Sequence, residues 1–95
     1  MPYIPSGRRS VLDEERKPIS YLGNPGVLNY VITREVLGYI EEEGSLSYSS
    51  INEVIGVLEC VKQELYRRLA APYEDGKCFE NGDVFPHVAS RVSVS

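Results

Sequence analysis

Residues 50–72, SINEVIGVLECVKQELYRRLAAP, carry the clearest structural signal in the chain. Apolar residues recur there at steps of three and four, which places them in one stripe along an α-helix. The stripe comprises Ile51, Val54, Ile55, Leu58, Val61, Leu65 and Leu69. Ser50 and Glu53 together form a capping box that predicts the start of the helix, and Pro72 predicts its end. We therefore expect a long amphipathic helix over about 50–71.

A second helix is predicted just before the first, over about 27–43. Its apolar residues repeat with the same spacing and comprise Leu28, Val31, Ile32, Val36, Leu37, Tyr39 and Ile40. The turn Asn24-Pro25-Gly26 precedes it, and Gly44 follows it as a residue suited to end a helix. Because the connection over 44–49 is short, the two helices are expected to form an antiparallel helical hairpin.

The flanking segments contain proline and glycine signals. Residues 1–9 are expected to be an extended arm, and Ser10 and Pro18 bound a short polar helix over about 11–17. After Pro72, two turn signals predict either an ordered loop or a tight β-hairpin over 78–85. We predict a mainly α fold, with residues 1–85 forming a single small helical domain and residues 86–95 forming a flexible tail.

Composition and charge exclude some classes of partner. The chain has 95 residues and a formal net charge of −4, which argues against binding duplex nucleic acid through its phosphates. The charge is uneven, because residues 1–34 carry +2 and residues 35–95 carry −6. A chain of this length buries only a modest core, so additional stability from homo-oligomerisation is expected.

The cysteines indicate a reducing compartment, and the lack of long apolar runs indicates a protein that is neither secreted nor inserted in a membrane. Cys60 and Cys78 are too few for a disulfide framework, and with His87 alone they match no metal-ligand spacing. We expect Cys60 in the core and Cys78 at the surface. The first ten residues lack the apolar run of a signal peptide, and no stretch is long enough to span a membrane. These features predict a soluble cytoplasmic protein with no membrane partner.

Tyrosine is the dominant aromatic residue and points to two candidate sites. A ring with a polar tip suits both protein interfaces and pockets that stack a nucleobase. Basic residues near two tyrosines could hold a small nucleotide, with the cations taking the phosphates. This candidate ligand site comprises Tyr3, Arg8, Arg9, Lys17 and Tyr21. The candidate interface residues are Val57 and Cys60, which lie beside the apolar stripe, together with Tyr39 and Tyr66. Ordinary surface roles for all of these residues remain open.

No motif for catalysis stands out. The single histidine, His87, lies in the predicted tail, so no catalytic triad is indicated. Glutamates on the two long helices suggest a magnesium-dependent nucleotide phosphohydrolase, but Glu53 and Glu64 are assigned to a cap and to an arginine pair. We therefore expect no catalytic residues, no metal and no cofactor.

Several segments are similar to a known family. MPYIP, RSVLDEE, NPGVLNYVIT and INEVIGVLECVKQELYRRLAAPYEDGKCFENGDVF resemble small uncharacterised proteins encoded mainly by bacteriophages. The resemblance extends to about Val84 and departs from the family near Pro18, where relatives look longer and more helical. It implies a phage or prophage origin and a single domain, but no chemistry.

The function expected first is that of a non-catalytic, phage-type binding protein that forms a homo-oligomer through its hairpin. By analogy with the helical anti-CBASS sponges, it would act in counter-defence and sequester a cyclic nucleotide or another small nucleotide signal of host immunity. One alternative is an adaptor or inhibitor that binds a host protein through the acidic second helix. The other is a small all-α magnesium-dependent nucleotide phosphohydrolase.

Overall fold

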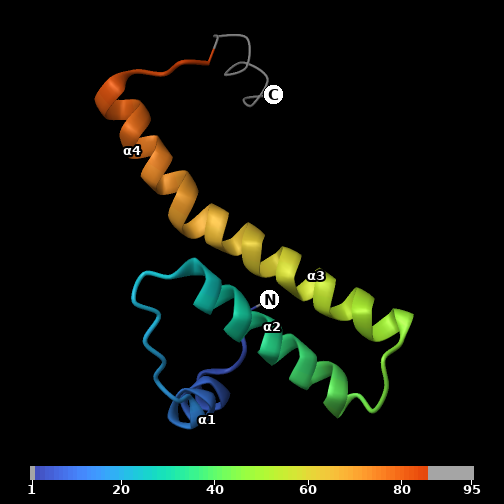
Figure 1. The fold of residues 1–95 in the computed structure, drawn as a ribbon. Helices are drawn as coiled ribbons and strands as arrows, with labels where there is room; N and C mark the ends of the chain where they lie inside the picture. The colour runs from blue at the N-terminus through green and yellow to red at the C-terminus, as the bar shows by residue number, and fades with distance from the viewer. Residues whose placement is uncertain (1, 86–95) are drawn as a thin grey trace. The chain divides into compact units, whose positions relative to one another are not determined.

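The computed structural model describes residues 2–85, and every regular element in that range is helical (Figure 1). The elements are α1 (Ser6–Glu15), α2 (Pro25–Glu42), α3 (Tyr48–Leu65), the π-helical turn η1 (Tyr66–Ala70) and α4 (Ala71–Asn81). The mainly α prediction is confirmed. The predicted tail, 86–95, lies outside the described residues. The chain divides into two compact units, Met1–Val61 and Lys62–Ser95, and the single-domain boundary at residue 85 stays a prediction.

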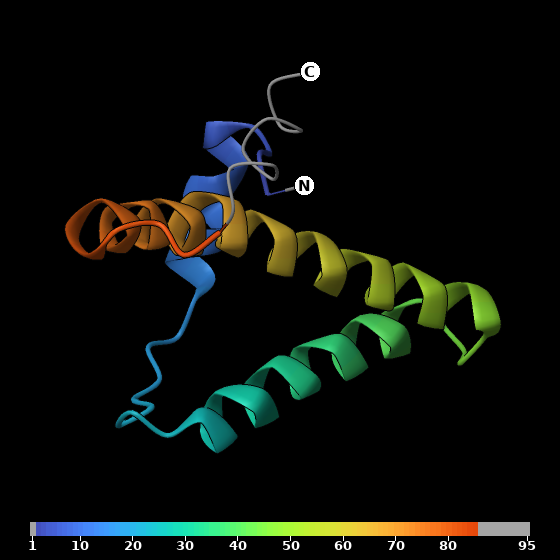
Figure 2. The same cartoon turned by 90° about the horizontal axis from the view of Figure 1, so that it is seen from above.

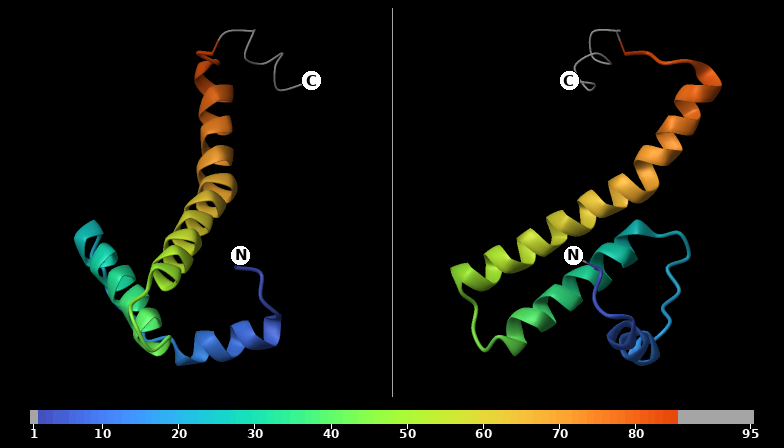
Figure 3. Two further views of the ribbon diagram at one scale, coloured as in Figure 1. Left: turned by 90° about the vertical axis from the view of Figure 1, so that its right-hand side faces the viewer. Right: turned by 180° about the vertical axis from the view of Figure 1, so that it is seen from behind.

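Within the first unit, α2 and the beginning of α3 form the predicted antiparallel hairpin. The side chain of Asn24 caps α2 by accepting a hydrogen bond of 2.9 Å from the backbone N–H of Gly26, and Pro25 occupies the first turn. Gly44 follows the helix with φ +98°, a conformation that glycine adopts at little cost. The two helices are close at their connection and diverge away from it (Figures 2 and 3).

The start of α3 differs from the predicted capping box. The helix begins at Tyr48, so Ser47 is the N-cap and Ser50 is the third helical residue. The backbone N–H of Ser50 donates to Oγ of Ser47 at 3.1 Å, and the backbone N–H of Ser47 donates to Oγ of Ser50 at 3.0 Å. This arrangement is a reciprocal capping box with serine in place of glutamate, which leaves Glu53 available for another contact.

Helix α1 starts earlier than the sequence suggested. It begins at Ser6, so the predicted extended arm over 1–9 is wrong from Ser6 onward. The hydroxyl of Ser10 does not cap a helix, because it donates to the carbonyl of Ser6 at 3.1 Å within α1. The helix ends at Glu15, two residues before Lys17, which Pro18 disfavours in the α conformation.

The second unit is helical where a loop or β-hairpin was predicted. Residues 71–81 form α4, so Pro72 does not end the helix and 78–81 are not a strand. The backbone N–H of Ala71 bonds to the carbonyl of Tyr66, five residues back, in the wider π-helical pattern. A local widening relieves the clash between a proline ring and the preceding turn. Gly82, with φ +89°, ends α4 instead of forming a hairpin turn.

The buried core is small and lies at the closed end of the hairpin. Among residues 2–85 only Ser50 and Val54 are buried, with 4% and 8% of their surface exposed. Both lie in the first two turns of α3, next to the connection. Cys60 is exposed, so its predicted place in the core is wrong, whereas the exposed Cys78 agrees with the prediction. Since the arms diverge beyond this core, their apolar residues remain partly open to water.

Candidate functional site

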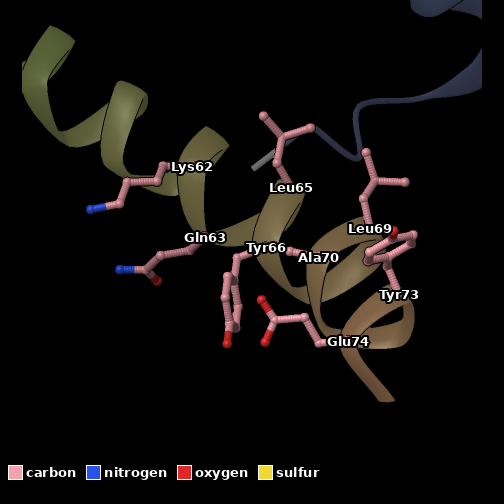
Figure 4. Close-up of a pocket in the computed structure, with 8 residues that line it drawn as sticks. All are labelled: Lys62, Gln63, Leu65, Tyr66, Leu69, Ala70, Tyr73 and Glu74. Carbon is pink, nitrogen blue, oxygen red and sulfur yellow. The ribbon is translucent and has the colours of Figure 1, made fainter. Parts of the chain in front are cut away.

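A shallow, mainly apolar hollow lies on the helix of the second unit, and we call it the apolar groove (Figure 4). It is lined by Lys62, Gln63, Leu65, Tyr66, Leu69, Ala70, Tyr73 and Glu74. Its central residues are strongly exposed, including Leu69 at 64% and Tyr73 at 66%. A run of large, exposed apolar side chains with polar residues at its ends is typical of an interaction surface.

Seven of the eight residues that line the groove fall into two rows, and Gln63 lies outside both. One row is Lys62-Tyr66-Ala70-Glu74 and the other is Leu65-Leu69-Tyr73, with a spacing of four residues in each. Figure 4 shows Leu65, Leu69 and Tyr73 along one edge, and Tyr66 and Glu74 along the other. Four residues of α-helix overshoot a full turn by about 40°, and the wider η1 turn offsets part of that drift. The π turn thus helps to keep both rows on one face.

Local ion pairs order the helix around the groove. Nη2 of Arg67 lies 3.4 Å from Oε1 of Glu64, and Nζ of Lys77 lies 3.5 Å from Oε2 of Glu80. Nζ of Lys77 also lies 5.6 Å from the centre of the Tyr73 ring. Exposed contacts of this kind each contribute about 0.2–1 kcal/mol to the stability of a fold. Of these contacts, the one between Lys77 and Tyr73 involves a residue that lines the groove.

In the first unit, a hydrogen bond joins the two arms of the hairpin near its closed end. Oη of Tyr39 on α2 donates to Oε2 of Glu53 on α3 at 2.9 Å. This bond raises the pKa of Tyr39 to about 12, with a smaller contribution from the nearby carboxylate of Glu43. Both carboxylates favour the neutral phenol, because a phenolate would lose the donated proton and repel them. Glu53, predicted to cap α3, therefore links the two helices.

The structure brings together two of the five predicted ligand-site residues. Lys17 and Tyr21 line one hollow of the first unit, whereas Tyr3, Arg8 and Arg9 are not among its lining residues. The full lining comprises Leu12, Asp13, Glu15, Arg16, Lys17, Ile19, Tyr21, Val31 and Glu35. Two cations thus share the hollow with three carboxylates. Such a mixture lowers the attraction for phosphate.

The predicted interface residues fall on separate surfaces. Tyr39 and Val57 line a small hollow between α2 and α3, together with Glu35, Val36 and Val54. Tyr66 lies in the apolar groove, and Cys60 is exposed on α3. The part of the groove formed by Tyr73 and Glu74 was not predicted from the sequence, because Pro72 was expected to end the helix. The four-residue spacing from Leu65 through Leu69 to Tyr73 is the signal that could have revealed it.

The described residues contain neither a cluster of metal ligands nor a helix that could span a membrane. Within residues 2–85, no three His, Cys, Asp or Glu side chains converge as a metal-ligand set, and the phosphohydrolase alternative stays a hypothesis. In the same range, every helix is too short or too polar to cross a bilayer.

The fold and the groove define a class of small, all-helical proteins with an exposed apolar helix face. A family model described as a domain of unknown function (DUF6899) matches residues 1–84, and the chain belongs to this family. Searches of curated proteins and of solved structures returned no match. This family assignment agrees with the expected resemblance to an uncharacterised family.

Proposed function

We propose that the chain is a non-catalytic binding protein that acts as a homo-oligomer. The observation that supports this proposal most strongly is the exposure of the apolar groove, whose central side chains are more than half open to water. Fully burying one large apolar side chain contributes about 1.5–3 kcal/mol. Contact with a second copy would recover part of that free energy for each residue that it covers.

The groove alone offers only part of what association requires. Loss of translational and rotational freedom costs about 4–15 kcal/mol, which offsets most of the free energy gained when the grooves of two copies are buried. The diverging arms of the hairpin supply further apolar surface, since Leu28, Ile32, Leu58 and Val61 are all exposed. We therefore propose that both surfaces contribute to assembly.

Light scattering coupled to size-exclusion chromatography tests the proposal with a matched pair of variants. Leu69→Glu places a charge in the apolar groove, whereas Leu22→Glu makes the same change in an exposed loop, where Leu22 is 92% exposed. The proposal predicts an oligomer for the wild type and for Leu22→Glu, and a shift toward the monomer for Leu69→Glu. A monomeric wild type, or equal masses for the two variants, would contradict it.

A second candidate function is supported by the hollow in the first unit. We propose, as this alternative, a counter-defence protein of phage origin that sequesters a small nucleotide. Tyr21, Arg16 and Lys17 line the same hollow, and an aromatic ring beside two cations could stack on a base while the cations contact its phosphate. The three carboxylates in the lining favour a ligand with few phosphates over a highly charged one.

Calorimetry with a panel of cyclic di- and trinucleotides tests the second candidate. Tyr21→Ala should abolish the binding heat, and Tyr30→Ala should preserve it, because Tyr30 lies on α2 and does not line the hollow. No heat from the wild type with any member of the panel would rule out the second candidate and leave the first unaffected.

A further inference from the structure

We infer that the apolar groove docks the same groove of a second copy, with the two helices antiparallel about a two-fold axis near residue 68. The inference depends on the proposed function, because it specifies how the proposed self-association takes place. An interface with a two-fold axis uses the same patch on both copies, so that patch must complement itself. Both rows of the groove meet this requirement.

The row Lys62-Tyr66-Ala70-Glu74 complements itself in charge and in size. In an antiparallel pair, each row lies opposite the same row of the second copy with its order reversed. Lys62 therefore faces Glu74 of the other copy, and Tyr66 faces Ala70. The pair has an ammonium-carboxylate contact at each end, and each ring packs over a methyl group, as large-to-small packing requires.

The row Leu65-Leu69-Tyr73 complements itself in hydrophobicity. Reversal places Leu69 opposite Leu69 at the centre and Leu65 opposite Tyr73 on either side. Every contact along this row joins large apolar surfaces, so pairing removes three side chains that are more than half exposed from water.

The opposite charges at the two ends of the groove favour the antiparallel orientation over the parallel one. They also favour a second copy of the chain over a different partner. A parallel pair would place Lys62 beside Lys62 and Glu74 beside Glu74, which costs free energy at both ends. A partner of uniform charge would match one end of the groove and be repelled by the other. A second copy in the reversed orientation matches both ends.

Charge exchange provides the test. In a Lys62→Glu dimer, or in a Glu74→Lys dimer, like charges would meet at both ends. We expect each variant alone to dimerise about tenfold more weakly than the wild type in sedimentation equilibrium. An equimolar mixture should recover wild-type affinity, because the heterodimer restores one opposite pair at each end. The double variant Lys62→Glu/Glu74→Lys should recover it as well.

Controls separate this inference from the proposed function. Glu41→Lys makes the same charge change on α2, outside the groove, and should leave the affinity unchanged. Circular dichroism checks that each variant keeps the wild-type helix content. A dimeric wild type whose variants all associate equally would overturn the antiparallel arrangement while leaving self-association in place, as would a mixture no tighter than its components. A monomeric wild type would overturn both.

Discussion

Oη of Tyr39 lies 2.9 Å from Oε2 of Glu53, and this hydrogen bond ties α2 to α3 across the hairpin. The two residues are 14 positions apart in the chain, on opposite sides of the connection. Val54, the most buried apolar residue in the described part of the chain, directly follows Glu53. The link and the small core are therefore together at the closed end of the hairpin, and both oppose the separation of the two arms.

Removing the hydroxyl should loosen the hairpin. In Tyr39→Phe the bond to Glu53 is lost while the ring is kept, so we expect the urea midpoint of unfolding to fall. Tyr30→Phe is the matched control on the same helix, and its midpoint should be unchanged. Equal midpoints for Tyr39→Phe and the wild type would show that the bond adds no stability.

The free energy of unfolding should also fall at alkaline pH, because Tyr39 loses its proton there. The folded state raises the pKa of Tyr39 from 10.0 to about 12, so folding favours the neutral phenol. The stabilisation is fully present below pH 10 and is lost as the pH rises from about 10 to 12. Ultraviolet titration of tyrosinate should show one group with a pKa near 12, which disappears in Tyr39→Phe. In Glu53→Gln, where the main cause of the shift is removed, that pKa should move back toward 10.0.

The serine capping box should act as one unit. Ser47→Ala should lower the free energy of unfolding by about 1 kcal/mol, since it removes the N-cap acceptor of α3. Ser50→Ala removes the other half of the reciprocal pair and should cost a similar amount. Because each bond depends on the other, the double variant should lose less than the sum of the two single losses. Ser49→Ala, between them in the chain, is the control, and additive losses would contradict the reciprocal arrangement.

A substitution at one exposed residue, Leu22, should stabilise the folded chain. Leu22 has φ +50°, a left-handed conformation that costs a leucine about 1–2 kcal/mol, and its side chain is 92% exposed. Leu22→Asn should raise the free energy of unfolding by about 1 kcal/mol, because asparagine adopts this conformation more readily. Leu46→Asn is the control at an exposed leucine with negative φ. A change of equal size in both variants would show that backbone strain is not the cause.

The helices were predictable from the sequence wherever the apolar spacing and the capping residues agreed. The hairpin of α2 and α3 follows from such spacing, and Asn24 and Gly44 mark the ends of α2 as expected. The helix beyond Pro72 was not predictable from local rules, because proline normally ends a helix. In this chain the preceding π turn accommodates Pro72.

The turn signal at Asn81-Gly82 was also ambiguous in the sequence. Glycine with positive φ serves both a hairpin turn and the end of a helix, so Gly82 alone does not distinguish them. Of the five residues predicted for the candidate ligand site, two line a common hollow. Lys17 and Tyr21 line one hollow with residues of α1 and α2, whereas Arg8 and Arg9 lie on α1 and are not among its lining residues.

Self-association requires a second copy to cover apolar helix surface that one chain leaves exposed. Sedimentation equilibrium of the wild-type chain over a wide range of concentrations measures this association. We expect a mass that rises with concentration to at least twice the 10.7 kDa of the single chain. A folded protein that stays at 10.7 kDa at every concentration would contradict it.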